Sequence, residues 1–236
     1  MKKEIFGLFL MAPMIAIAAD APPPPWEGAA EAGLNIATGN TETEDLNAKM
    51  GITHNQGRWH HHVGLDAVNS ATNDTTTAAR YSAAYKVGYD ITDRYYALGS
   101  ARYDKDRFSG FDHQSSISAG IGWHAFLPEP TKLDLEIGAG VRESELTTGE
   151  AETEAIARFS LGFSHQFSDT ARFFQDLLIE GGSSNVFIQS GTGIEVKMID
   201  KLALKLGYTV RNNSDPSSGK KDTDTLTSVN LVYSLF

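Results

Sequence analysis

A period-two alternation of apolar and polar residues runs from Trp26 to the C-terminus and constrains the fold of this chain more than any other feature. Between positions 131 and 142, for example, charged residues or glycines separate the apolar residues Leu133, Leu135, Ile137, Ala139 and Val141. In an extended strand, such alternation places the apolar side chains on one face and the polar side chains on the other. Because the pattern recurs and almost no helical period accompanies it, the sequence predicts an all-β fold.

Twelve segments carry this alternation. We expect strands at 26–38, 43–54, 58–70, 75–91, 94–104, 114–126, 131–142, 152–167, 171–181, 186–198, 202–212 and 223–236. Short connections at 55–57, 92–93, 127–130, 168–170 and 199–201 alternate with connections at 39–42, 71–74, 105–113, 143–151, 182–185 and 213–222, several of them longer. An even strand number with this arrangement is typical of outer-membrane proteins. The sequence therefore predicts a closed antiparallel transmembrane β-barrel with short periplasmic turns, longer extracellular loops and both chain ends on the periplasmic side.

A secreted sandwich or a lipocalin-like barrel would show the same alternation with its apolar face turned inward. Strand length favours the membrane barrel, because these segments are long for a sandwich and suit a tilted membrane strand. The chain also ends in an alternating strand with a terminal aromatic residue, Phe236, although Phe236 is one residue out of phase with Tyr233. Aromatic residues gather at the short-turn ends, and we expect a second girdle from Tyr81, Tyr103 and Phe187. The first girdle comprises Trp26, Trp59, Tyr89, Tyr95, Trp123, Phe167, Phe173 and Tyr233.

Residues 1–19 have the composition of a secretory signal peptide. Two lysines precede an apolar stretch at 5–17, which is too short to span a bilayer, and Ala16 and Ala18 on either side of Ile17 fit the small-x-small pattern of a cleavage site. We expect the proline-rich residues 20–25 to form a periplasmic tail and residues 26–236 to form the outer-membrane β-barrel. This organisation predicts export through the periplasm to the cell outer membrane.

The overall charge and the missing residue types exclude several classes of function. The chain has 30 Asp and Glu against 20 Lys and Arg, and this net charge of −10 argues against a nucleic-acid partner. It has no cysteine, which excludes disulfides, thiolate metal sites and a cysteine nucleophile. No glycine-rich phosphate loop, HExxH motif or nucleophile elbow is present. We therefore expect no cofactor and no bound metal.

The residues between the apolar ones carry charges of both signs. Our candidates for the lumen face are Glu31, Lys49, Arg80, Lys86, Arg102, Asp134, Glu136, Arg142, Arg158, Glu195, Lys205 and Arg211. A strongly selective pore usually shows rings of one sign, whereas this balance favours ion pairs across the lumen. Twelve strands lie between the filled barrel of about eight strands and the open pore of about sixteen. The pattern leaves two interpretations open, a narrow passive channel and a structural or surface-interaction barrel with a sealed lumen.

Charged residues also gather at the outer side of the predicted strands 94–104 and 114–126. Asp104, Asp106, Arg107, Asp112 and His113 fall in or beside the expected 105–113 loop. A ligand or cation site would explain this concentration of charge in a loop. A salt-bridged loop that stiffens or plugs the mouth would also explain this concentration of charge, and we favour this second interpretation.

His113 and Ser115 lie two residues apart and share one face of a strand, which their parity with Ile117 turns toward lipid. A His/Ser pair on the lipid side of a twelve-stranded barrel resembles outer-membrane phospholipase A. A triad also needs a group that orients the histidine and an oxyanion donor, and spacing identifies no Asp or Asn for the first role. A lipid-modifying enzyme is therefore the least favoured alternative, and we expect no enzyme.

Four histidines, at 54, 60, 61 and 62, surround the periplasmic turn of the second predicted hairpin. Alternation turns His60 and His62 to one face and His61 to the other. Two of these imidazoles together with His54 could hold a metal. With Trp59 beside them, however, we favour an interfacial band of aromatic and imidazole rings.

Three stretches carry a resemblance to a known family: WEGAAEAG at 26–33 followed by TGNT at 38–41, YDKDRFSGFD at 103–112, and TKLDLE at 131–136 with the closing LVY at 231–233. They resemble the YdiY-like family, a family of unknown function often described as salt-induced outer-membrane proteins. The resemblance implies an outer-membrane barrel linked to salt or osmotic stress, and it supplies no catalytic residues. We expect a monomer in contact with outer-membrane lipid and lipopolysaccharide, assembled by the barrel-assembly machinery through its C-terminal strand.

Overall fold

The computed structural model describes residues 25–38, 43–72, 75–106, 111–127, 130–216 and 219–236. The strands are β1 (Trp26–Thr38), β2 (Thr43–Gln56), β3 (Trp59–Thr72), β4 (Thr75–Asp90), β5 (Tyr95–Asp106), β6 (Phe111–Phe126), β7 (Thr131–Leu146), β8 (Ala151–Gln166), β9 (Ala171–Gly181), β10 (Val186–Ile199), β11 (Leu202–Asn213) and β12 (Thr223–Ser234). Each strand pairs antiparallel with its neighbours in the chain, and β1 closes the ring on β12. The predicted closed antiparallel β-barrel is confirmed. Within these ranges, no helix is long and apolar enough to cross a membrane.

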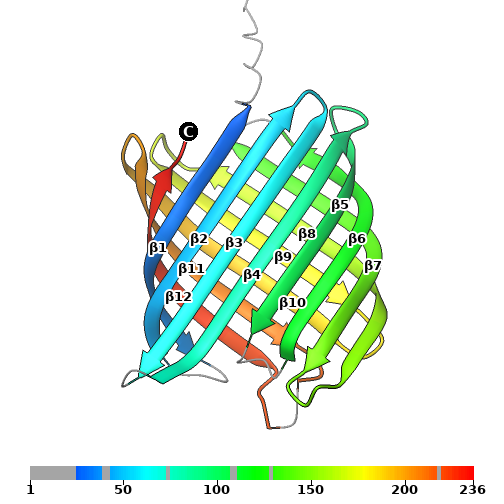
Figure 1. Ribbon diagram of the computed structural model, residues 1–236. Helices are drawn as coiled ribbons and strands as arrows, with labels where there is room; N and C mark the ends of the chain where they lie inside the picture. Colours follow the sequence, from blue (N-terminus) through cyan, green and yellow to red (C-terminus); the bar gives the residue numbers. More distant parts are fainter. Residues whose placement is uncertain (1–24, 39–42, 73–74, 107–110, 128–129, 217–218) are drawn as a thin grey trace, which may run out of the picture.

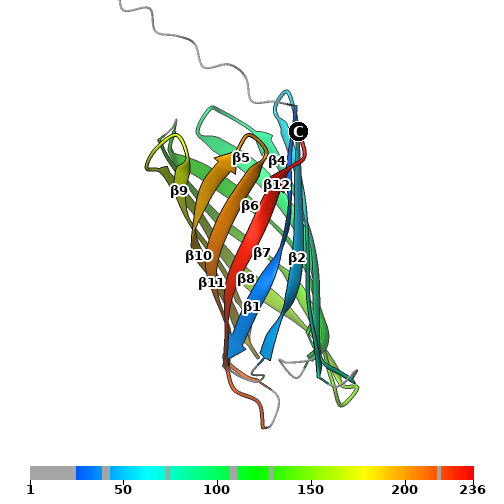
Figure 2. The ribbon, with the colours of Figure 1, turned by 90° about the vertical axis from the view of Figure 1, so that its left-hand side faces the viewer.

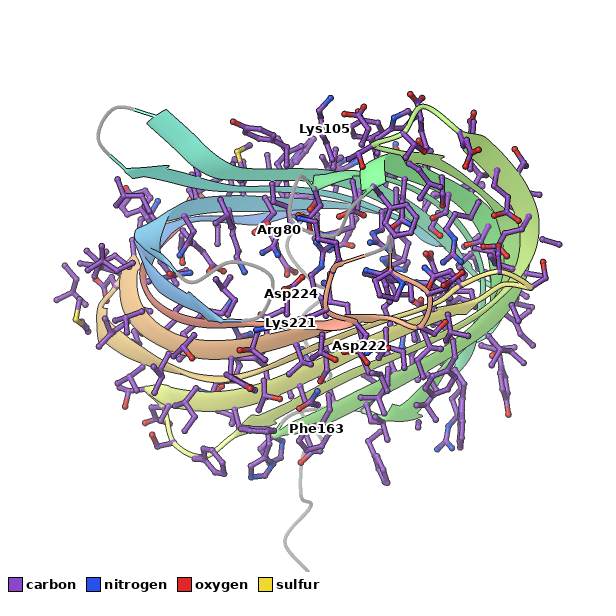
Figure 3. The ribbon with its side chains drawn as sticks, turned by 90° about the horizontal axis from the view of Figure 1, so that it is seen from below. Arg80, Lys105, Phe163, Lys221, Asp222 and Asp224 are labelled. Atoms are coloured by element: carbon purple, nitrogen blue, oxygen red, sulfur yellow. The ribbon has the colours of Figure 1, made fainter. Side chains whose placement is uncertain are left out.

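The two ends of the barrel are easily distinguished (Figure 1). The inner end carries the connections 57–58, 91–94, 167–170 and 200–201 and also the C-terminus, and the outer end carries the connections 147–150 and 182–185. The seam between β1 and β12 runs along one side of the barrel (Figure 2). Seen from the outer end, the cross-section is oval, Arg80 points into the opening and Lys105 lies outside the wall (Figure 3).

Strand pairing sorts the side chains into an apolar outer face and a polar inner face. On the outer face, Ile121, Ile137 and Phe159 are cross-strand neighbours on β6, β7 and β8. Ile121 and Ile137 are each 57% exposed in the isolated chain. The next residue along β7, Glu136, points inward and is buried. A large exposed apolar face around a buried polar interior is the reverse of a soluble barrel and suits hydrocarbon surroundings.

A pair of lysine substitutions tests this orientation. We expect Ile137→Lys to lower the unfolding free energy in lipid vesicles by about 2–4 kcal/mol, because Ile137 lies near the middle of β7 and faces outward. Gly191→Lys is the matched control. A Cβ atom added at Gly191 meets no atom within 4 Å, and Gly191 lines the lumen cavity. We expect a much smaller change for it. Denaturant titration of both variants in the same vesicles would contradict the assigned faces if Gly191→Lys cost as much as Ile137→Lys.

Aromatic rings form a belt around the inner end. Trp59 packs on Tyr89 with ring centroids 4.9 Å apart, and Tyr95 stacks on Trp123 at 6.5 Å. The second expected girdle was partly wrong. Tyr81 and Tyr103 are exposed on the outer face, but Phe187 is buried in the lumen, where the guanidinium carbon of Arg102 lies 4.2 Å from its ring centroid. The positive charge of Arg102 attracts this ring inward.

The strands extend farther toward the outer end than the sequence indicated. β5 continues to Asp106 and β6 begins at Phe111, so residues 105–106 and 111–113 of the expected 105–113 loop belong to strands. The expectation that Asp104, Asp106, Asp112 and His113 belong to an outer loop is therefore wrong. The register explains the extension, because β4 supplies pairing partners for β5 as far as Asp106. Arg107 lies outside the described residues.

Candidate functional site

The lumen contains a polar cavity of about 660 Å³. Among the residues predicted to face the lumen, its lining includes Glu31, Lys49, Arg80, Lys86, Arg102, Asp134, Glu136, Arg158, Lys205 and Arg211. Glycines contribute much of the remaining wall, including Gly64, Gly162 and Gly191. Because glycine has no side chain, these positions leave the space that the charged side chains would otherwise close.

Near β1 and β12, the cavity wall is a chain of polar contacts. Lys205 Nζ donates to Glu31 at 2.7 Å, and the amide of Asn230 donates to the other oxygen of the same carboxylate at 3.0 Å. Asn47 in turn donates to Asn230 at 3.0 Å. A buried charge is tolerated only when it is paired and hydrogen-bonded, and here both conditions are met.

A second cluster, the Glu136 network, fills one side of the lumen. The buried carboxylate of Glu136 accepts from Lys86 Nζ at 2.7 Å, from the Tyr96 hydroxyl at 2.8 Å and from Arg158 at 2.8 Å. These partners come from β4, β5 and β8, so the network joins strands that are not neighbours. Gly122 makes room for it, because a Cβ atom there would lie 2.1 Å from the Tyr96 ring. One side of the barrel is therefore closed by side chains.

Nearer the outer end, charged side chains span the lumen, and we call this set the outer crossing. Arg211 on β11 donates to Asp104 at 2.6 Å and to Asp106 at 3.1 Å, both on β5. The order of strands around the ring places β5 and β11 on opposite walls. Arg102 also pairs with Asp104 and, at 3.2 Å, with Glu180 on β9. Arg211 thus bridges the barrel from wall to wall where the cavity meets the mouth.

Two of the predicted lumen residues lie away from the cavity. Arg142 is 1% exposed and donates to Glu154 at 2.5 Å and to the backbone carbonyls of Glu180 and Asn185. It therefore anchors the connection between β9 and β10. Glu195 pairs with Arg172 at 3.1 Å near the inner end, where the Arg172 side chain is half-exposed.

Asp176 differs from the other charged residues that line the cavity. Each of the others has an oppositely charged side chain or an imidazole within 4 Å. Among the described residues, no ion pair within this distance involves Asp176, which lies opposite Gly191 in the register of β9 and β10. The cavity therefore presents one carboxylate whose charge no adjacent partner cancels.

The charged residues of the expected outer loop do not form one site. Asp104 and Asp106 belong to the outer crossing inside the barrel. Asp112 lies 3.4 Å from Lys105 and 3.5 Å from His113, and this second group is more exposed. Asp104 and Asp106 therefore face the lumen, whereas Asp112 and His113 lie at the rim.

The geometry around His113 does not form a catalytic triad. Glu145 Oε2 lies 3.7 Å from His113 Nδ1, so β7 supplies an acidic neighbour that spacing along the chain did not reveal. Within the described part of the chain, however, no hydrogen bond joins His113 to Ser115. His113 instead stacks on Tyr103 with ring centroids 5.7 Å apart. A nucleophile needs contact with its base, and that contact is missing here.

The four histidines of the second hairpin separate between two faces. His54 and His61 belong to the aromatic belt, where His54 packs on Trp26 at 4.1 Å and His61 accompanies Trp59 at 6.2 Å. His62 contacts Thr53 at 3.0 Å.

His60 points inward to Asp90 on β4, close to His124 and Asp134 on β6 and β7. Spacing along the chain did not connect these four residues, although His124 and Asp134 are direct cross-strand partners in the hairpin of β6 and β7. From the expected hairpin, the contact between His124 and Asp134 could have been predicted.

An apolar outer belt, closed strand pairing and a charged lumen define a porin-like fold of the outer-membrane type. Among solved structures, the chain is similar to the NanC porin, with a TM-score of 0.59, 6% identity and coverage of 86% of this chain and 98% of that one. It is also similar to the KdgM porin, with a TM-score of 0.51, 10% identity and coverage of 88% and 99%. The translocator domain of the autotransporter NalP from Neisseria meningitidis has a TM-score of 0.50, 14% identity and coverage of 91% and 90%. At these identities the similarity is one of fold.

Residues 30–235 match the model of the family described as "Protein of unknown function, DUF481", and the chain belongs to this family. A curated relative is the "Uncharacterized protein YdiY" of Escherichia coli (strain K12), which is 29% identical over 218 residues. The match covers 89% of this chain and 84% of the relative. The predicted membership of a YdiY-like family is confirmed.

Proposed function

We propose that this chain forms a narrow passive channel in the outer membrane, constricted near its outer end. The observation that carries this proposal is the polar cavity of about 660 Å³ inside a closed barrel. The Glu136 network and the outer crossing narrow the path without filling that cavity. The NanC and KdgM structures are porins by name, and their similarity in fold supports the same class of function.

The proposed orientation places the inner end in the periplasm. A cleaved signal peptide at 1–19 and a periplasmic tail at 20–25 fit this orientation, because both chain ends would then be on the side from which the chain arrives. We propose a monomer held in outer-membrane lipid and lipopolysaccharide. The barrel-assembly machinery would recognise the C-terminal strand, whose outward residues Val229, Leu231 and Tyr233 are exposed.

Small uncharged or zwitterionic polar solutes suit this lumen best. Nearly all of its fixed charges are paired, so a solute meets neither a ring of acids nor a ring of bases. One KdgM structure is described as a complex with oligogalacturonate. In the present chain the basic residues of the cavity are neutralised by carboxylates, which disfavours a polyanion. Asp176 supplies a slight local preference for cations.

Planar bilayer recording of refolded protein tests the proposal. We expect small discrete conductance steps and a reversal potential near zero in a salt gradient, with a weak cation preference that Asp176→Asn removes. A boiled-versus-unboiled gel shift is the control for a folded barrel. A folded barrel without conductance would exclude the channel and leave the alternative of a structural or surface-interaction barrel with a sealed lumen.

We propose no catalytic role, because His113 and Ser115 are not hydrogen-bonded, the NanC and KdgM structures of similar fold are porins by name, and the relative YdiY is uncharacterised. Any lipase activity of the purified protein that Ser115→Ala abolished would overturn this view. A physiological link to salt stress comes from the family resemblance alone. Growth of a deletion strain in high-salt medium tests that link separately.

A further inference from the structure

Asp176 stands between two glycines on the wall of the lumen cavity. In the strand register, Gly162 on β8 and Gly191 on β10 are its direct cross-strand partners. A Cβ atom at Gly191 would meet no atom within 4 Å, and one at Gly162 would meet only Asp176 Oδ1, at 3.9 Å. Asp176 itself is exposed to the cavity. The space on both sides of its carboxylate is therefore open to a solute.

Four cationic side chains lie close enough to Asp176 for their charges to attract its carboxylate. Three of them are already hydrogen-bonded to other carboxylates at 3.1 Å or less, Lys86 to Glu136, Arg172 to Glu195 and Lys205 to Glu31. The fourth is Lys49 on β2. It differs from the other three in its hydrogen bonding.

The ion pair of Lys49 is loose. Its Nζ lies 3.6 Å from Asp66 Oδ2, which is longer than a hydrogen bond, and among the described residues this ammonium donates no hydrogen bond. Asp66 is also the acidic neighbour of Arg80, whose Nε lies 3.9 Å from Asp66 Oδ1, so one carboxylate is shared between two cations. The Lys49 side chain is 30% exposed. Its three N–H donors are therefore available to a solute in the cavity.

Lys49 and Asp176 lie on nearly opposite walls of one cavity. Four strands separate β2 from β9 along one side of the ring, and six separate them along the other. Both residues line the same space of about 660 Å³. An available cationic donor therefore faces an available anionic acceptor across the lumen. A solute with an ammonium group at one end and a carboxylate at the other matches both charges.

We propose that the lumen cavity contains a binding subsite for small zwitterionic solutes of the amino-acid type. Asp176 accepts hydrogen bonds from the ammonium group of the solute, and Lys49 Nζ donates to its carboxylate. Hydrogen bonds between charged groups are stronger than those between neutral groups, so a solute that makes both contacts is favoured over one that makes a single contact. The subsite rests on the proposed channel, because a solute must enter the lumen to reach it.

The positions of the two residues also indicate which zwitterions fit. Because Lys49 and Asp176 project from different walls, the solute must be long enough to reach both of them. An ω-amino acid, whose charges stand at the two ends of a carbon chain, should therefore bind more tightly than an α-amino acid. An inorganic ion satisfies only one of the two residues, and a neutral solute satisfies neither charge.

Titration of refolded full-length protein with ε-aminohexanoate tests the subsite, with binding followed by NMR in detergent micelles. Two comparison solutes each lack one charge, since ω-aminohexanol has no carboxylate and ω-hydroxyhexanoate has no ammonium. We expect saturable binding of ε-aminohexanoate and an affinity about tenfold lower for each comparison solute, because each loses one hydrogen bond between charged groups. A boiled-versus-unboiled gel shift verifies that the barrel is folded.

Two substitutions assign the ends of the solute. Asp176→Asn should weaken binding of ε-aminohexanoate about tenfold but should not weaken binding of ω-hydroxyhexanoate, which has no ammonium. Lys49→Gln should have the same effect on ε-aminohexanoate but should not weaken binding of ω-aminohexanol. Asp134→Asn is the matched control, because this carboxylate also lines the cavity but is hydrogen-bonded to His124. It should weaken binding much less than Asp176→Asn.

Absence of saturable binding to the folded wild type, or equal affinity of the wild type and Asp176→Asn for ε-aminohexanoate, would overturn the subsite. If a variant does not fold, the two comparison solutes still test both ends on the wild type. Binding is measured without a current, so the result is separate from the test of the channel. A silent barrel that binds ε-aminohexanoate would support the subsite and exclude the channel, whereas a conducting barrel that binds none would overturn the subsite alone.

Discussion

Replacing Arg211 with methionine should raise the single-channel conductance above that of the wild type. Arg211 is the side chain that reaches from β11 to Asp104 and Asp106 on the opposite wall. Methionine fills much of the local volume but cannot bond either carboxylate, so the two walls lose their link. The same change should lower the unfolding free energy by about 3–5 kcal/mol, because the buried carboxylate of Asp106 loses this cation, while Asp104 keeps only its pair with Arg102. Bilayer recording and denaturant titration measure the two effects.

A matched substitution separates the outer crossing from a general loss of charge. Arg172 also pairs with a carboxylate, Glu195, but the two residues are direct neighbours on β9 and β10 and do not span the lumen. Arg172→Met should therefore leave the conductance unchanged and cost little stability, since exposed ion pairs contribute little. Adding Asp104→Asn and Asp106→Asn to Arg211→Met should recover stability while the larger conductance remains. If Arg211→Met conducted like the wild type, the outer crossing would not be the constriction.

Replacing Arg142 with methionine should lower the unfolding free energy by about 3–5 kcal/mol, the usual effect of breaking a buried ion pair from one side. Arg142 is almost completely buried, and it pairs with Glu154 while bonding the backbone carbonyls of Glu180 and Asn185. The substitution therefore leaves a buried carboxylate and two carbonyls without this donor. Denaturant titration in lipid vesicles measures the loss.

The double variant Arg142→Met with Glu154→Gln provides the control for this prediction. Removing the charge of Glu154 should restore part of the lost stability, because the penalty comes largely from the uncompensated carboxylate. Ser184 would still donate to position 154, as its backbone and hydroxyl groups now do at 2.9 and 2.8 Å. Equal stability of the single and double variants would argue against this explanation.

Much of the barrel follows from local sequence periodicity. Alternation such as that from Leu133 to Val141 assigns each residue of β7 to one face, and the observed strand agrees with it. The outer ends of β5 and β6 were placed less accurately. β5 extends to Asp106 and β6 begins as early as Phe111, because both strands pair with neighbouring strands there. In the sequence alone, the many charged residues of this segment are typical of a loop.

The lumen shows even more clearly which features a local pattern predicts and which features depend on the closed barrel. The period-two pattern predicted that Glu136 and Arg211 face inward, because side-chain direction alternates along a strand whatever its neighbours are. It could not indicate that Lys86 and Arg158 would share Glu136, or that Arg211 would reach β5, because those contacts depend on how the ring closes. It also assigned Phe187 to a membrane girdle, whereas Arg102 and Arg211 attract the ring into the lumen.

The sequence by itself determined the strand number, the two faces of the barrel and the membership of the lumen in broad terms, because these depend on a period of two that is local to each strand. Only the tertiary structure decided which charges neutralise one another, where the lumen is crossed and which carboxylate, Asp176, has no ion-pair partner among the described residues. Those properties depend on distances between strands far apart in the chain, and these distances are set only when β1 closes on β12.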